Sequence, residues 1–146
     1  MPSARAAGLP PFRITRVAAA PLFGESPKGG WAAEIRPEDS IHAIIAVHTD
    51  QGLTGYGSVF TDGRLVQAAL KVLEPLYRDE DALTPERVTE KLHQNTFWMG
   101  RGGTLTHTIS GIDIALWDIL GQATGLASAV CSAAGYARGC NPIARC

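Results

Sequence analysis

The segment from Leu105 to Thr124 constrains the fold more than any other part of this sequence, because it predicts a long helix that is apolar on two sides. At about 100° per residue, one face of this helix gathers its aliphatic side chains. These are Ile109, Ile112, Leu116, Ile119 and Leu120. Ile114 and Trp117 point well away from that face, and we place the small Gly111 and Gly121 on the Ile114 side. Such a helix needs two packing partners, either both within this domain or one of them outside this chain.

The first sixty residues predict three strands. Residues 13–22 are rich in Ile, Val, Thr and Ala, which is typical of a strand. Residues 41–49 alternate apolar and polar side chains, residues 50–52 form a turn with a glycine, and residues 53–60 continue in strand-like composition. This pattern predicts an antiparallel hairpin. The Gly- and Pro-rich residues 23–40 have no periodicity, and so long a loop is usually functional or disordered.

Two further helices are expected between the hairpin and the long helix. Apolar residues recur every three or four positions from Gly63 until Pro75, where we expect the first helix to end, and Asp62 is a suitable N-cap. The second helix has Thr84 as its predicted N-cap and Pro85 at its first position. Its predicted inward residues are Val88, Leu92 and Phe97 or Trp98.

Length and charge exclude several classes of protein. The chain has 146 residues, whereas an α/β barrel typically needs about 250. Its 13 basic and 14 acidic residues give a net charge of −1, without the clustered basic excess that nucleic acids or anionic membranes require. The longest apolar stretch, residues 41–47, is far shorter than the roughly 20 residues of a membrane helix, and residues 1–8 precede no signal-peptide core. We therefore expect a soluble cytoplasmic protein that binds neither nucleic acid nor membrane.

The three cysteines crowd the end of the chain, at Cys131, Cys140 and Cys146. A secreted disulfide framework normally distributes an even number of cysteines through the fold. The pattern therefore argues against an oxidising compartment.

The histidines and the densest acidic run suggest no metal site. His42 and His48 share one strand face, but six residues at about 3.3 Å each separate them by roughly 20 Å. His93 and His107 have no further ligand at a suitable spacing on their helix faces. Residues 79–81, Asp-Glu-Asp, lack the glycine and the converging oxygen atoms of a cation loop, and we interpret them as a solvated turn.

No acid/base pair or nucleophile motif is evident either. Asp113 and Asp118 face about 140° apart on the long helix, so we assign them to helix-surface solvation or interdomain hydrogen bonding. No Ser-His-Asp, Cys-His, phosphate-loop or dinucleotide-binding spacing occurs. We predict no catalytic residue and no metal ligand in this chain.

Two segments carry possible binding chemistry. Residues 98–103 combine flexible backbone amides, Arg101 and the start of a helix, a combination that suits a carboxylate, although Gly-rich connections between helices are common. The long loop and the end of the hairpin carry side chains that could wall a substrate pocket. The substrate-binding candidates are Lys28, Trp31, Phe60, Thr61, Trp98 and Arg101.

The order of these elements and two stretches of sequence resemble a known family. The stretches are VHTDQGLTGYG at residues 47–57 and ISGIDIALWDILGQATG at residues 109–125. Residues 13–126 resemble the N-terminal capping domain of the mandelate racemase and muconate lactonizing enzyme group of the enolase superfamily. The resemblance implies an α+β fold, a three-stranded antiparallel meander followed by a helical part, with no α/β barrel present in this chain.

The resemblance also implies a catalytic mechanism, and in this family the residues that perform it belong to the barrel. In such enzymes the barrel carries carboxylates that bind magnesium, and Lys or His bases that abstract a proton alpha to a substrate carboxylate. No residue of this chain matches those ligands or bases. The cap supplies two loops that close over the barrel and select the substrate, and these map to residues 23–40 and 58–64. The side of the long helix that carries Trp117 would face the barrel.

Within the group, this sequence looks most like the acid-sugar dehydratases, which implies a small sugar-acid substrate and a homo-oligomeric intact enzyme. Racemases and cycloisomerases share the same cap and remain alternatives. An alternative of another class is a non-catalytic module that recruits a partner through the face of Ile114 and Trp117.

These considerations divide the chain into a disordered N-terminus at residues 1–12, the cap at residues 13–126 and a disordered, non-family tail at residues 127–146. The tail has no acidic residue and no apolar period. The tail contains the run Ala-Val-Cys-Ser-Ala-Ala-Gly. A GC-rich nucleotide sequence that encodes this run also encodes Arg-Leu-Leu-Gly-Gly-Arg when it is read in another frame, and this second peptide resembles the family's sequence at this point. We therefore hypothesise a frameshifted tail on a cap that is separated from its catalytic half and is inactive alone.

Overall fold

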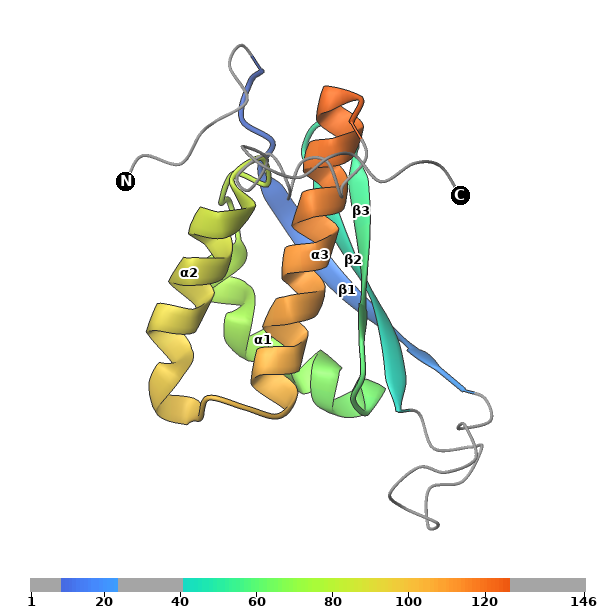
Figure 1. Ribbon diagram of the computed structural model, residues 1–146, viewed down its shortest axis with the longest axis vertical. Helices are drawn as coiled ribbons and strands as arrows, with labels where there is room; N and C mark the ends of the chain where they lie inside the picture. The colour runs from blue at the N-terminus through green and yellow to red at the C-terminus, as the bar shows by residue number, and fades with distance from the viewer. Residues whose placement is uncertain (1–8, 24–40, 127–146) are drawn as a thin grey trace, which may run out of the picture.

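The chain folds as a three-stranded antiparallel sheet followed by helices, in a computed structural model that describes residues 9–23 and 41–126 (Figure 1). The strands are β1 (Ile14–Leu22), β2 (His42–Thr49) and β3 (Thr54–Val59), paired in the order β1-β2-β3. The helices are α1 (Gly63–Tyr77), α2 (Pro85–Thr96), the short 3-10 helix η1 (Phe97–Met99) and α3 (Thr104–Thr124). This confirms the predicted α+β meander, and the described ranges contain no barrel. Of the N-terminal residues 1–12 that we predict to be disordered, residues 1–8 lie outside the described residues, as do the tail at residues 127–146 and residues 24–40.

Alternation along the strands directs one face of the sheet to the core. In β2, residues 43, 45, 47 and 49 are buried while the residues between them are not. Successive side chains of a strand point to opposite faces, so this pattern gives the sheet one apolar face. Gly52 closes the hairpin with a φ of 81°, a left-handed conformation that glycine adopts without steric cost.

All of the described helices lie on the side of that apolar face. Helix α1 contacts β1, α3 contacts β3 and β2, and α2 packs on α3 and α1 (Figure 1). The core between them is built from fully buried aliphatic side chains, among them Ile14, Ile45, Leu73, Leu92 and Leu116. None of the described helices has both the length and the apolar character needed to cross a membrane.

Helix α1 begins where the sequence predicts and ends two residues later. The Asp62 side chain accepts a hydrogen bond from the backbone N–H of Arg64, which confirms the predicted N-cap. Pro75 does not end the helix, which continues to Tyr77. Tyr77 is buried, and its packing holds the last turn in place even though the proline cannot donate a backbone hydrogen bond.

Helix α2 differs from expectation at both ends. Thr84 occupies the N-cap position, but its hydroxyl donates to the Asp81 carbonyl at 2.8 Å and does not cap the helix. Phe97 and Trp98 are 60% and 69% exposed, so the prediction that one of them faces inward is wrong. The α-helix ends at Thr96, and the tighter 3-10 turn that follows changes the direction of the side chains.

Helix α3 packs within the domain against the sheet and against the other two α-helices, but this packing leaves Ile114 uncovered, so the choice between the two alternatives stays open. It contacts β3 and β2 on one side and α1 and α2 on the other. Gly111 lies against Val59 and Ile45 of the sheet, whereas Ile114 is exposed, so the assignment of this glycine to the Ile114 side is wrong. Ile114 remains outside the core and is 50% exposed.

Candidate functional site

The end of the sheet where β1 leaves and β2 enters presents an exposed aromatic side chain, Phe60. Leu22 of β1 pairs with His42 of β2, and Phe60 directly follows β3 at the same end. The Phe60 ring meets the His42 ring edge to face, with centroids 4.9 Å apart. His107 in the first turn of α3 bonds through Nδ1 to the Phe60 carbonyl oxygen at 3.0 Å. Phe60 is thus anchored on two elements while 56% of it stays exposed.

The carboxylate nearest to Phe60 in sequence is already neutralised. Asp62 forms an ion pair with Arg64, with 2.7 Å between Oδ2 and Nη2. The hydrogen bonds from the Arg64 side chain and backbone lower the pKa of Asp62 to about 2. Asp62 therefore remains ionised and paired at neutral pH, and its charge is offset at this end of the domain.

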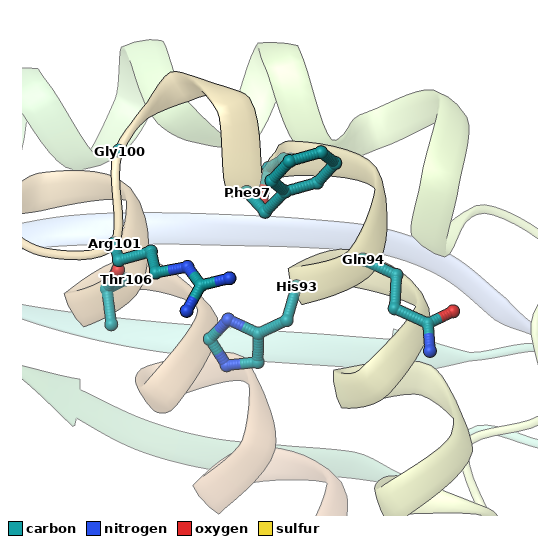
Figure 2. Close-up of a pocket in the computed structure, with 7 residues that line it drawn as sticks. His93, Gln94, Phe97, Gly100, Arg101 and Thr106 are labelled. Atoms are coloured by element: carbon teal, nitrogen blue, oxygen red, sulfur yellow. The ribbon is translucent and has the colours of Figure 1, made fainter.

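A second place with binding chemistry lies between the end of α2 and the start of α3. There an open pocket of about 570 Å³ is lined by His93, Gln94, Thr96, Phe97, Gly100, Arg101 and Thr106. Figure 2 shows the imidazole of His93 and the guanidinium of Arg101 pointing toward one another. Figure 1 shows that this loop and the turn after β3 occupy the same end of the domain.

The structure does not bring the described candidates into one pocket. Arg101 lines the pocket, whereas Phe60 and Thr61 lie at the turn between β3 and α1. Trp98 is not among the lining residues, and its indole N–H donates to the Asn95 carbonyl at 3.2 Å. The other two candidates, Lys28 and Trp31, lie outside the described residues.

His93 is a pocket residue that the sequence reasoning missed. His93 has no further metal ligand on its own helix face, and its neighbour in the pocket is Arg101, which follows the turn that contains η1. The sequence carried a signal for this position, since His93 lies in the last turn of α2, a few residues before the Gly-rich residues 98–103.

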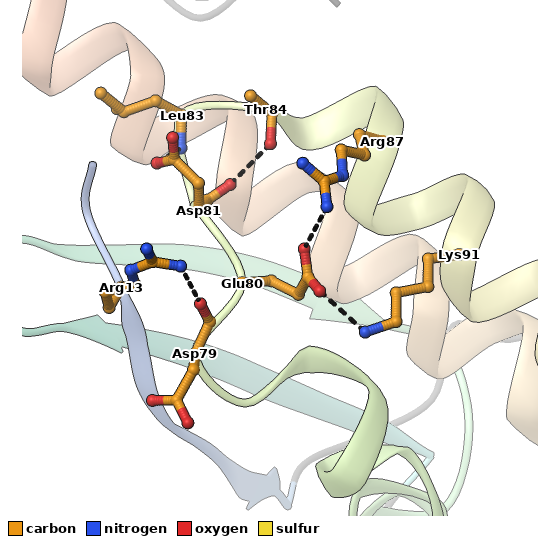
Figure 3. Close-up of polar contacts among 8 residues, drawn as sticks. All are labelled: Arg13, Asp79, Glu80, Asp81, Leu83, Thr84, Arg87 and Lys91. Carbon is orange, nitrogen blue, oxygen red and sulfur yellow. Dashed lines mark hydrogen bonds and ion pairs between the residues drawn. The ribbon is translucent and has the colours of Figure 1, made fainter. Parts of the chain in front are cut away.

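The acidic run at residues 79–81 is a structural junction and not a solvated turn (Figure 3). Asp81 Oδ1 accepts hydrogen bonds from the backbone N–H groups of Phe12 at 3.0 Å and Leu83 at 3.1 Å. These bonds hold the segment before β1 against the segment before α2. Our interpretation of this run was wrong because the partners of Asp81 include a residue almost seventy positions away.

The other two residues of the run tie the same elements together. Glu80 accepts from Lys91 Nζ at 2.7 Å and pairs with Arg87 at 3.6 Å, both on α2 (Figure 3). The guanidinium of Arg13 donates to the Asp79 carbonyl at 2.7 Å. All three acidic residues therefore lie in a network that joins α1, α2 and β1.

The remaining carboxylates on α3 also have structural partners. Asp113 accepts from the Thr89 hydroxyl at 2.7 Å, and Asp118 accepts from the backbone N–H of Tyr56 at 3.0 Å. Both bonds lie within the domain, unlike the solvation or interdomain contact that we expected. Across residues 9–23 and 41–126, no group of three or more His, Cys, Asp or Glu side chains could hold a metal ion.

The sequence matches a protein-family model and several characterised enzymes. Residues 35–129 match the family model described as mandelate racemase / muconate lactonizing enzyme, N-terminal domain. A D-galactonate dehydratase family member of Paenibacillus sp. strain JDR-2 is 42% identical over 88 residues, which cover 57% of this chain and 21% of that protein. The arabinonate dehydratase of Saccharolobus solfataricus is 38% identical over 79 residues, covering 52% of this chain and 21% of that enzyme.

The fold has counterparts among solved structures. A mandelate racemase/muconate lactonizing enzyme from Polaromonas sp. JS666 superposes with a TM-score of 0.62 at 26% identity, covering 82% of this chain and 32% of that protein. The chain spans about a fifth of the length of the curated relatives that it matches.

Proposed function

This chain belongs to the mandelate racemase / muconate lactonizing enzyme family through its N-terminal domain, and from that premise we propose that it caps the substrate space of a sugar-acid dehydratase. The names of the relatives, which include galactonate and arabinonate dehydratases, support this substrate class. The observation that carries the proposal is the anchored and exposed Phe60 at the end of the sheet. We also propose that the intact enzyme is a homo-oligomer and is located in the cytoplasm.

The described residues would bind and orient a substrate. An exposed aromatic ring that is fixed by its neighbours offers an apolar wall to a sugar carbon face and excludes water from it. Phe60 has this property, and Thr61 beside it has a hydroxyl for a sugar hydroxyl group. We propose the same substrate-binding role for Lys28 and Trp31, which precede β2 in the sequence.

Magnesium is the metal that the family implies, and the described residues do not fit it. The carboxylates of Asp81, Asp113 and Glu80 bond to a backbone N–H group, a hydroxyl group and a basic side chain, and the described residues contain no group of three or more potential ligands that could hold a metal ion. We therefore assign no metal ligand and no proton-abstracting base to the described residues. We also propose that the 146-residue chain is inactive by itself.

Inactivity is tested on the full chain. Purified protein would be incubated with D-galactonate or arabinonate and Mg²⁺, and the keto product of dehydration would be measured. We expect no product above the background without protein. Turnover that is lost with a chelator would contradict the inactivity of this chain while supporting the dehydratase assignment.

The capping role is tested in a chimera. Residues 1–126 would replace the matching part of the Paenibacillus relative, and kcat and KM for D-galactonate would be compared among variants. Phe60→Ala should raise KM about tenfold, because the apolar wall is lost. Tyr56→Ala is the matched control, since Tyr56 is equally exposed but lies within β3, away from the end of the sheet. Equal effects of the two variants would contradict a specific role for Phe60.

Two alternatives remain testable. A racemase or a cycloisomerase of the same family would give the chimera an isomeric product in place of a dehydrated one. A non-catalytic module would use the face of Ile114 and Trp117, and the exposure of Ile114 favours a contact there. Sedimentation distinguishes a non-catalytic module from an isolated enzyme cap. A module should be monodisperse or form a defined complex. An isolated cap should aggregate through this face, and Ile114→Ser should make it monodisperse.

The frameshift hypothesis for residues 127–146 remains a separate proposal. It is tested by the nucleotide sequence of the gene beyond codon 126. A shifted frame that encodes a continuing barrel supports it, and a shifted frame that stops or encodes no barrel contradicts it.

A further inference from the structure

Among the described residues, the basic side chains of Arg101 and His93 have no hydrogen-bond or ion-pair partner, and neither has Lys71 on α1, which does not line the pocket. The other described arginines each bond to a carboxylate, a carbonyl or an imidazole. These are Arg13, Arg16, Arg64, Arg78 and Arg87. The guanidinium of Arg101 has no hydrogen-bond or ion-pair acceptor within residues 9–23 and 41–126, and the ring of His93 likewise has none there.

Both of these side chains line the same pocket and point toward one another across it (Figure 2). The lining contains no carboxylate. Glu90 is the acidic residue of α2 that is nearest to His93 in the sequence, and it accepts a hydrogen bond from the Gln94 amide at 2.6 Å. Phe97 adds an apolar wall. The pocket therefore concentrates unused donors and one permanent positive charge beside an aromatic surface.

We propose that this pocket is a binding site for a small carboxylate, held by Arg101 and His93. A guanidinium presents two parallel N–H donors, which match the two oxygens of a carboxylate. The imidazole donates one further N–H in either of its protonation states. A volume of about 570 Å³ lies within the range of small-molecule sites.

The charge of the pocket selects a carboxylate over a phosphate ester. Arg101 provides one permanent charge, which balances a singly charged ligand. A phosphate group carries a charge of about −1.5 to −2 at neutral pH and offers three acceptor oxygens. The pocket supplies too few cationic donors for that charge.

This site does not rest on the proposed dehydratase role. Phe60 and Thr61 are not among the residues that line it. Failure of the capping experiment would leave this pocket unaffected, and failure of carboxylate binding here would leave the role of Phe60 unaffected.

The test is an NMR titration of the ¹⁵N-labelled 146-residue chain with Ile114→Ser, a change outside the pocket that prevents the expected aggregation. The titrants are sodium acetate, sodium D-gluconate, sodium phosphate and sodium chloride at matched ionic strength. Acetate and gluconate should give saturable shifts of the backbone amides of Gly100, Arg101 and Thr106. Chloride should give none, and phosphate should bind more weakly than either carboxylate. Equal shifts with chloride, or tighter binding of phosphate, would overturn the assignment.

Variants identify the residues responsible. Arg101→Gln should weaken carboxylate binding about tenfold or more, because it removes a charge-assisted hydrogen bond. Arg101→Lys should weaken it less, since the charge remains without the planar pair of donors. Arg78→Gln removes an arginine just after the end of α1, outside both loops, and should leave the affinity unchanged. Wild-type affinity in Arg101→Gln would refute the proposal.

Discussion

Gly57 of β3 lies directly against the backbone of Gly111 in α3. A Cβ atom placed on Gly57 would be 2.0 Å from the Gly111 carbonyl oxygen, far inside van der Waals contact. Gly55, two residues earlier on the same strand face, has the same relation to the carbonyl of Ala115. The two glycines let α3 approach β3 closely, and this approach sets the helix that carries His107 against the strand that presents Phe60.

Gly57→Ala should therefore destabilise the fold. The methyl group meets a backbone carbonyl, which cannot rotate away as a side chain can, so we expect the free energy of unfolding to fall by about 3 kcal/mol or more. Gly102→Ala is the matched control, because nothing lies within 4 Å of a Cβ there and its expected effect is within about 0.5 kcal/mol. Urea unfolding measures both. Equal stabilities would show that α3 is not in contact with β3.

The sequence predicted the parts of this fold that depend on local patterns. Alternation in β2, the glycine turn after it and the capping residue Asp62 are properties of a few neighbouring residues, and each was confirmed. The predicted side of α3 for Gly111 was wrong, because a helical wheel gives the angle of each residue and does not say which element packs on each side. Gly55 and Gly57, which alternate on one face of β3, were the signal that a helix backbone approaches this strand.

The candidate site was predicted only in part, for similar reasons. Phe60 and Arg101 could be named as candidates because an aromatic residue after a strand and an arginine in a Gly-rich loop are local features, and their binding roles stay predictions. The exposure of Trp98 was missed because the helical period was extended through η1, where the backbone winds differently. The role of Asp81 was missed because its bond to Phe12 joins distant segments.

Asp81→Ala should destabilise the domain by about 1–3 kcal/mol. The change leaves the backbone N–H groups of Phe12 and Leu83 without their acceptor, and an unsatisfied donor in a partly buried place costs this amount. Asp79→Asn is the control, because Asp79 has a φ of 64°, which asparagine tolerates well. Urea unfolding at pH 7 compares the two. A stable Asp81→Ala variant would restore the interpretation of this run as a solvated turn.

Arg64→Ala should raise the pKa of Asp62 from about 2 toward its usual value of 3.8, because the side-chain hydrogen bond of Arg64 is the largest cause of the lowered pKa. The lowered pKa means that Asp62 contributes stability above about pH 4, which is lost as the pH falls through about 2. NMR titration of the Asp62 carboxyl carbon measures the pKa. Arg78→Ala, at the other end of α1, should leave it unchanged. An unchanged pKa in Arg64→Ala would exclude this pairing.

His48 should make the domain less stable in mild acid. Its Nε2 accepts from Arg16 at 3.1 Å and its Nδ1 lies 3.0 Å from the Thr54 hydroxyl, so the neutral ring is already bonded on both sides. Burial, and then the charge of Arg16, lower the pKa of His48 below its usual 6.5. The unfolded chain therefore takes up a proton more readily, and the contribution of His48 to stability is complete above pH 6.5 and is lost as the pH falls through the lowered pKa. In urea unfolding from pH 7.5 to pH 5, His48→Gln should lose less stability than the wild type. Arg16→Gln should lie between them, because burial of the ring remains when the charge is removed. Parallel pH profiles for wild type and His48→Gln would contradict this assignment.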